Sequence, residues 1–157
     1  MQIQIRHEYQ ASPDRVAEML TNEKFLRLVA AKAGAMSHRV TKTSDGAQLH
    51  AQVAAPNEMR RFVGDSFSVN LDLAVQPVAD QHYQGQLTGD VERMPAKMNG
   101  TAQIKPSGAG SVVNYDIEFN VNVPLVGRKL EQAAEPQVRK IVDMQQRAGE
   151  RYLAEND

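Results

Sequence analysis

The sequence predicts one α+β domain in which a curved antiparallel sheet of about six or seven strands packs against a long C-terminal helix. Three observations predict it. Most segments between residues 36 and 123 alternate apolar and polar residues, which is the period of a half-buried strand. Two short amphipathic segments precede them in residues 12–34. Apolar residues recur every three or four positions in residues 125–154, which is the period of a helix.

The first strand and the two short helices are expected at the N-terminal end. Alternation in residues 2–10 predicts a strand with His7 on its apolar face. Ser12 and Pro13 then predict a helix start, because serine caps helices and proline suits the first helical position. A break at residues 21–23 supplies a second cap for the second short helix.

The central segment is expected to be a meander in which turn residues separate the strands. Turn signals occur at residues 44–46, 79–81 and 106–110. The alternation is clearest in residues 67–76 and 113–123. Every strand has one apolar and one polar face, so one side of the sheet faces solvent and the long helix must cover the other.

The long helix is predicted over residues 125–154. Its apolar face carries Leu130, Ala134, Val138, Ile141, Ala148 and Tyr152. Pro136 lies inside this helix, where proline normally kinks the chain, and a break into two helices is the alternative.

Composition narrows the classes of function. The 157 residues include no cysteine, which removes disulfides, thiolate metal sites and a cysteine nucleophile. Lys and Arg total 18 against 19 for Asp and Glu, so no basic excess points to nucleic acid. Residues 1–7 lack the features of a signal peptide, and no segment has the ~20 apolar residues of a spanning helix. We therefore expect a cytoplasmic protein without stable membrane insertion.

Chemical motifs are sparse. No glycine-rich phosphate loop and no H-E-x-x-H motif occurs, and the sequence predicts neither a metal site nor a cofactor. His7 and His38 fall on the apolar faces of their strands. Such a histidine is either a general base inside a cavity or a hydrogen-bonded core residue.

A family resemblance follows from residues 7–16, 22–25 and 124–131 together with the order of the elements. Residues 7–16 resemble a first strand that runs into a Ser/Pro-initiated helix, and the other two segments resemble entries to the second and the C-terminal helix. With this order, the chain resembles the START/polyketide-cyclase/birch-pollen-allergen superfamily, also called the helix-grip or SRPBCC fold. Within it, the chain resembles an uncharacterised bacterial branch known as a domain of unknown function. The resemblance implies a single helix-grip domain over residues 1–157.

An apolar cavity between sheet and helix is the main functional expectation. Small residues such as Gly85, Gly89 and Gly100 on the inner face leave volume, and apolar pockets of this kind are typical ligand sites. The expected apolar lining is Met59, Phe62, Leu71, Leu87, Phe119, Ala134, Val138 and Ile141. Tyr115 and His38 are expected to orient the polar head of a ligand.

Three functions are open at this point. The leading one is carriage of a small hydrophobic molecule, which is lipid-, isoprenoid- or polyketide-like, by a monomer or homodimer without any chemistry. The first alternative is a cyclase/aromatase-like enzyme with His7, His38 or Tyr115 as acid or base. The second is a protein-interaction module whose cavity is closed.

Overall fold

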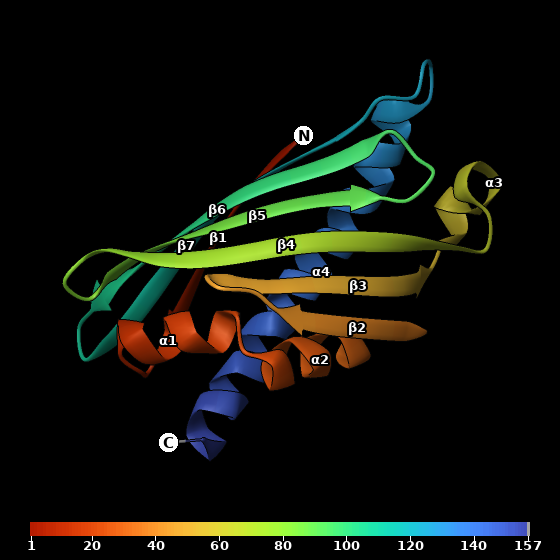
Figure 1. The fold of residues 1–157 in the computed structure, drawn as a ribbon. Helices are drawn as coiled ribbons and strands as arrows, with labels where there is room; N and C mark the ends of the chain where they lie inside the picture. The colour runs from red at the N-terminus through yellow and green to blue at the C-terminus, as the bar shows by residue number, and fades with distance from the viewer. Residues whose placement is uncertain (157) are drawn as a thin grey trace.

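The computed structural model describes residues 1–156 of the chain (Figure 1). Its elements are β1 (Gln2–Tyr9), α1 (Pro13–Leu20), α2 (Glu23–Lys32), β2 (Ser37–Lys42), β3 (Gly46–Ala54), the 3₁₀ turn η1 (Asn57–Met59), α3 (Arg60–Val63), β4 (Ser66–Ala79), β5 (His82–Val91), β6 (Ala96–Ser107), β7 (Gly110–Val121) and α4 (Gly127–Glu155). This order is the one that the sequence predicts, with the irregular stretch after β3 forming η1 and α3.

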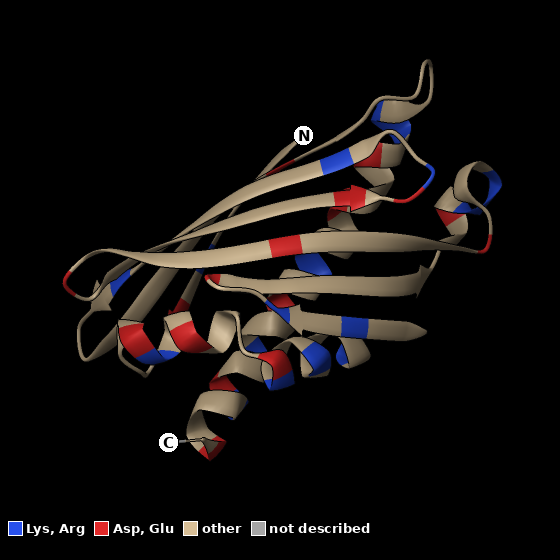
Figure 2. Cartoon of the chain, viewed as in Figure 1, with Lys and Arg blue, Asp and Glu red and all other residues tan. Residues whose placement is uncertain are grey.

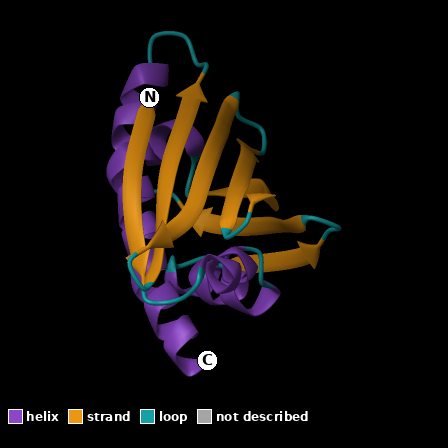
Figure 3. Ribbon diagram, turned by 90° about the vertical axis from the view of Figure 1, so that its left-hand side faces the viewer, coloured by secondary structure: helices purple, strands orange, loops and turns teal. Residues whose placement is uncertain are grey.

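The strands form one seven-stranded antiparallel sheet in the order β1-β7-β6-β5-β4-β3-β2. Only β1 leaves its sequence neighbours, because it pairs with β7 at one edge. Figure 3 shows that the sheet bends strongly, with α4 lying along the half that contains β1 and β7. The predicted curved sheet and long helix, and with them the helix-grip architecture, are confirmed.

The two short helices cover one end of the sheet's inner face, between β2 and α4 (Figure 1). Their starts are capped as expected, since Ser12 Oγ accepts from the Arg15 amide at 3.4 Å and Asn22 Oδ1 from the Phe25 amide at 3.2 Å. Arg15 also donates from its guanidinium to the Leu153 carbonyl at 2.8 Å. This end of the molecule is therefore closed.

The buried core has a large part at this closed end and a smaller part beneath the opposite half of α4. The larger part includes Val16, Met19, Phe25, Ile104, Val113 and Leu153. The smaller part consists of Ile3, Ile117, Phe119 and Val142. α4 contacts β1 and β7 at one edge of the sheet. β4 and β5 lie further along the sheet, away from α4, and this separation leaves an interior space.

Two expectations about proline are corrected by the structure. α4 continues through Pro136 as one helix, so the alternative of a break there is wrong. β6 runs through Pro106, which lies opposite Ser111 near the strand end, so the turn is shorter than residues 106–110. A proline is tolerated at a strand end because few ladder hydrogen bonds remain to be made there.

Candidate ligand-binding cavity

A cavity of about 410 Å³ lies between the inner face of the sheet and helices α2 and α4. Its volume falls within the ~300–1,000 Å³ of typical small-molecule sites. Apolar residues from all the layers around it make up nearly the whole wall. The cavity is therefore suited to the apolar body of a small molecule.

The strands supply the larger part of this wall. Their inward residues include Leu49, Ala51, Val69, Leu71, Leu73, Leu87, Met98, Ala102 and Phe119. Glycines alternate with these larger residues on β5 and β6. A Cβ at Gly85 would lie 3.3 Å from Ala102 Cβ, and one at Gly89 would lie 2.6 Å from Leu71 Cδ2. The absence of side chains at these positions lets neighbouring strands stay close while the space above them remains open.

The middle of α4 forms the facing wall. Leu130, Ala134, Val138 and Ile141 line the cavity from this helix. Ile141 retains 41% of its surface exposed although it is apolar and lies on the lining, whereas the next residue, Val142, is 8% exposed. Both residues line the cavity, but Val142 is also covered by Ile3 and Ile117 of the sheet.

The cavity wall carries little polarity and no inward charge. Its two charged residues, Asp90 and Lys97, are exposed and pair on the outer face of the sheet, in alternation with the inward Gly89 and Met98. The polar residues left on the lining at inward positions are Thr21, Tyr115, Gln137 and Gln145.

Tyr115 belongs to a buried polar cluster at the wall. Its ring packs edge-on against that of His7, with centroids 5.2 Å apart, and the Tyr9 hydroxyl lies 3.5 Å from His7 Nδ1. The Tyr115 hydroxyl and His7 Nε2 are both buried without a hydrogen-bond partner. An unsatisfied buried polar group costs about 1–3 kcal/mol, so this pair is an energetic exception within the core.

Burial also controls the charge of this cluster. It lowers the pKa of His7 to about 4, against a smaller opposing effect of Asp143. Burial raises the pKa of Tyr115 above its usual value. At neutral pH the imidazole and the phenol are therefore both uncharged.

Of the ten residues expected in the ligand site, eight line the cavity. They are Met59, Leu71, Leu87, Tyr115, Phe119, Ala134, Val138 and Ile141. They come from five elements that are distant in sequence, and the fold brings them around one space. The structure places the other two, His38 and Phe62, outside it.

The expectation that His38 points into the interior is wrong. His38 lies opposite Ala51 and so shares the inner face of the sheet, but its side chain is exposed. β2 is an edge strand, and it begins beyond the end of α2 (Figure 1). Val40, two residues later, is covered by Leu26 of α2 and is buried. Alternation predicted the face correctly, but coverage by a helix decides burial.

The inward placement of Phe62 is also wrong. Met59 at the end of η1 and Val63 at the end of α3 line the cavity, while Phe62 is 37% exposed. The guanidinium of Arg61 lies 5.2 Å from the centroid of the Phe62 ring. Val63, and not Phe62, is therefore the residue of α3 that faces the cavity.

Other kinds of functional site have less support in the structure than the cavity does. Within residues 1–156, no group of three or more His, Asp or Glu side chains is placed to hold a metal ion. His50 lies on the outer face, where its Nδ1 is 2.7 Å from Asn70 Oδ1. Figure 2 shows acidic and basic residues interspersed along the helices and strands rather than gathered by sign. No helix in this part of the chain is long and apolar enough to cross a membrane.

Comparison with known protein families gives one match that spans the chain. A family model described as a protein of unknown function, DUF2505, matches residues 4–153. The chain belongs to the DUF2505 family. No curated protein matches this DUF2505 sequence.

Solved structures show that this DUF2505 chain shares the helix-grip fold of START-like proteins. A START superfamily protein from Mycobacterium smegmatis is 17% identical with a TM-score of 0.61, covering 99% of each chain. The protein TTHA0849 from Thermus thermophilus is 14% identical with a TM-score of 0.69, covering 100% of each chain. Norcoclaurine synthase from Thalictrum flavum, in complex with dopamine and hydroxybenzaldehyde, is 14% identical with a TM-score of 0.61, covering 100% of this chain and 88% of the synthase. At these identities the likeness concerns the fold, and it agrees with the helix-grip fold that the sequence resemblance implies.

Proposed function

We propose that this DUF2505 chain binds and carries a small hydrophobic molecule, which is lipid-, isoprenoid- or polyketide-like, without transforming it. The observation that carries the proposal is the apolar cavity of about 410 Å³, whose wall includes an apolar residue, Ile141, left 41% exposed. Large apolar side chains are normally covered in a folded protein. A ligand in the cavity supplies that cover.

The energy available supports reversible carriage. Burial of apolar surface contributes roughly 25 cal/mol per Å², so a ligand that buries about 350 Å² gains on the order of 9 kcal/mol before costs. Loss of ligand freedom offsets several kcal/mol of this gain. The balance corresponds to an affinity weaker than nanomolar, which suits a carrier that must also release its ligand.

An enzyme that works in the cavity has less support. Norcoclaurine synthase has a similar fold and is named as an enzyme, but a shared fold does not imply a shared function. Here His38 is exposed outside the cavity, and His7 Nε2 is covered. Tyr115 therefore lines the wall without an accessible base beside it.

An interaction module with a closed cavity is also less favoured. The outer face of the sheet carries polar rows, such as Gln48, Asp72 and Thr88 on neighbouring strands. A docking face for a stable protein partner normally has an apolar centre. Apart from Ile141, the exposed large apolar residues each come from a different segment of the chain, and they are Leu28 on α2, Met36 before β2, Phe62 on α3, Val78 on β4 and Leu125 before α4.

Three further expectations remain part of this proposal: a single domain over residues 1–157, a monomer or homodimer, and a cytoplasmic location. They are consistent with a freely diffusing carrier. Native mass spectrometry reports the oligomeric state directly, as the stoichiometry of the assembly.

The first test is native mass spectrometry of protein purified gently from its own host, followed by extraction and identification of bound small molecules. We expect a stoichiometric hydrophobic adduct. A mass equal to the bare polypeptide, in protein that also fails to bind an apolar probe, would contradict the proposal.

The second test fills the cavity. N-phenyl-1-naphthylamine is a neutral probe that fluoresces in apolar surroundings. The Ala134→Phe variant places a ring into the cavity from α4 and should weaken probe binding at least tenfold. The matched control is Ala154→Phe, on an exposed position of the same helix, which should bind as the wild type does. Equal binding by both variants would place the probe elsewhere.

A further inference from the structure

Two unpartnered polar atoms lie together at the cavity wall. The Tyr115 hydroxyl and His7 Nε2 are both buried without a partner, and they belong to rings that pack 5.2 Å apart. Buried polar groups in folded proteins are nearly always satisfied. Two exceptions at one place in the core mark a position where an additional hydrogen-bonding group is wanted.

The sheet register explains why this position belongs to the cavity. Tyr115 lies between Ile5 of β1 and Ala102 of β6 on the inner face. Because Ala102 is small, the Tyr115 ring stays half-buried and forms part of the cavity lining. His7 is the next inward residue after Ile5, so it lies behind Tyr115 toward the closed end.

Tyr9 sets the chemistry of His7. Its hydroxyl is 3.5 Å from His7 Nδ1, and which of the two atoms donates depends on the tautomer of the imidazole. A neutral imidazole carries one proton, so in the tautomer in which Tyr9 donates to Nδ1 that proton lies on Nε2. In that tautomer the pair presents two donors, Nε2–H and the Tyr115 O–H. One acceptor oxygen between them would satisfy both.

The surroundings select against a charged oxygen. The charged residues of the cavity wall, Asp90 and Lys97, are exposed on the outer face of the sheet. The facing helix contributes Gln145, an uncharged amide, to the lining, and its Asp143 is exposed. A carboxylate or phosphate at this position would be buried without a counter-charge, which is strongly unfavourable.

We propose that His7 and Tyr115 form a polar end of the cavity that receives one uncharged oxygen, a hydroxyl or a carbonyl, of the hydrophobic ligand. This inference rests on the carrier function proposed above and restricts it to neutral alcohols and ketones, in place of fatty acids or phospholipids. The Tyr115 hydroxyl and His7 Nε2 are both covered in the structure, so contact with the ligand requires a tilt of the Tyr115 ring that uncovers them.

The test compares ligands that differ only in their head. Displacement of N-phenyl-1-naphthylamine by 1-decanol, 2-decanone and decanoate is measured at pH 7.5 in the wild type and in Tyr115→Phe. We expect the alcohol and the ketone to bind the wild type at least tenfold more tightly than decanoate. With the affinity of the probe measured separately in each protein, Tyr115→Phe should weaken the alcohol and the ketone about three- to tenfold, as loss of one hydrogen bond predicts.

Tyr152→Phe is the matched control. Tyr152 packs against Phe25, with ring centroids 5.4 Å apart, and lies outside the cavity lining. Removal of its hydroxyl should leave the affinity for all three ligands at the wild-type value. A parallel loss in Tyr152→Phe would show a general effect of hydroxyl removal and would overturn the proposal.

Thermal unfolding without ligand supplies a second readout. Tyr115→Phe removes an unpartnered buried hydroxyl, so the Tm of the ligand-free protein should be unchanged or higher. This is the result expected of a residue that serves ligand binding and does not stabilise the fold. A lower Tm would assign the hydroxyl a structural role and overturn the proposal. Equal affinities of wild type and Tyr115→Phe for 1-decanol, or tight binding of decanoate, would also overturn it while leaving the carrier function intact. Failure of the wild type to bind the probe at all would overturn both.

Discussion

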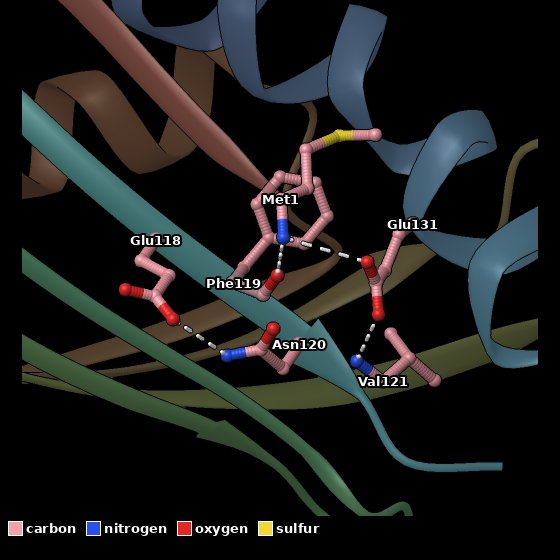
Figure 4. Close-up of polar contacts among 6 residues, drawn as sticks. All are labelled: Met1, Glu118, Phe119, Asn120, Val121 and Glu131. Atoms are coloured by element: carbon pink, nitrogen blue, oxygen red, sulfur yellow. Dashed lines mark hydrogen bonds and ion pairs between the residues drawn. The ribbon is translucent and has the colours of Figure 1, made fainter.

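Glu131 Oε2 accepts a hydrogen bond from the Val121 amide at 2.9 Å, and this contact joins the first turns of α4 to the last residue of β7 (Figure 4). The other carboxylate oxygen lies 3.5 Å from the ammonium of Met1, which also donates to the Phe119 carbonyl at 3.0 Å. The Glu131 side chain is only 18% exposed. Because Leu130, the preceding residue, lines the cavity, this contact fixes where the helical wall begins.

Loss of this carboxylate should destabilise the fold. In Glu131→Ala the Val121 amide and the Met1 ammonium lose their acceptor in a partly buried position, which costs about 1–3 kcal/mol. Chemical denaturation measures the change in the free energy of unfolding.

Glu135→Ala is the control, because it makes the same substitution one turn later on α4. Glu135 forms an i,i+4 ion pair with Arg139 at 3.1 Å on the surface, and such pairs contribute at most about 0.5 kcal/mol. Equal destabilisation by the two variants would show that the contact with β7 contributes nothing.

α4 approaches β1 closely at Gly149. A Cβ at this position would lie 2.9 Å from Tyr9 Cε1 and 3.1 Å from Met19 Cε. Alanine favours helices over glycine by about 1 kcal/mol, yet Gly149→Ala should destabilise the protein, by about 1–3 kcal/mol, because overpacking outweighs propensity. Combining it with Tyr9→Leu, which removes the ring, should recover part of the loss. Purely additive effects in this double-mutant cycle would contradict the close approach.

Stability should fall as the pH is lowered from about 6.5 to about 4. The pKa of His7 is near 6.5 in an unfolded chain and about 4 in the folded protein, where burial disfavours the charged imidazole. Between these values the unfolded chain binds a proton that the folded chain does not, so unfolding becomes more favourable with acid. Tyr9, Tyr115 and the exposed Asp143 surround the ring, and Asp143 offsets only a small part of the effect.

His7→Leu should flatten this pH profile of Tm in that window. The control is His38→Leu, which removes an exposed imidazole on the same face of the sheet. Asp14, whose pKa is lowered by hydrogen bonds from Tyr83 and Gln81, loses its contribution only at more acidic pH. A His7→Leu profile as steep as that of the wild type would show that another group titrates with folding.

Alternation and helical period predict most of the fold, because each element must present an apolar face to one interior. They place Leu71, Leu87, Tyr115 and Phe119 on the inner face without knowledge of the strand order. Strand pairing then brings them together. The sequence does not show how far a covering helix extends, which is why His38 is exposed although it occupies an inward position.

Contacts between distant elements are the part that local patterns miss. Nothing near Glu131 in the sequence indicates that its carboxylate reaches Val121 and Met1. Val121 ends β7, and the β1–β7 pairing brings Met1, which precedes β1, to the same place. The same pairing places His7 beside Tyr115. On α3, a helix of four residues, one turn gives too little periodicity to distinguish Phe62 from Val63.

Ile141 and Val142 both line the cavity from α4, and they offer a direct test of whether the exposed part of this wall binds the ligand. They are adjacent in sequence, yet Ile141 is 41% exposed on the cavity wall and Val142 is 8% exposed in the core with Ile3 and Ile117. Ile141→Glu keeps its carboxylate in contact with water, so the free energy of unfolding should change by less than about 1 kcal/mol. A charge at the wall should nevertheless weaken N-phenyl-1-naphthylamine binding at least tenfold.

Val142→Glu should behave in the opposite way. It buries an unpaired carboxylate against the sheet, which costs several kcal/mol and should abolish or severely reduce folding, as seen by circular dichroism. Ile141→Ser separates charge from size at the cavity wall, and it should weaken the probe less than Ile141→Glu does. If Ile141→Glu bound the probe as tightly as the wild type, the space beside α4 would not be the binding site. If it unfolded the protein as Val142→Glu does, Ile141 would belong to the core, and its exposure would have no connection with a ligand.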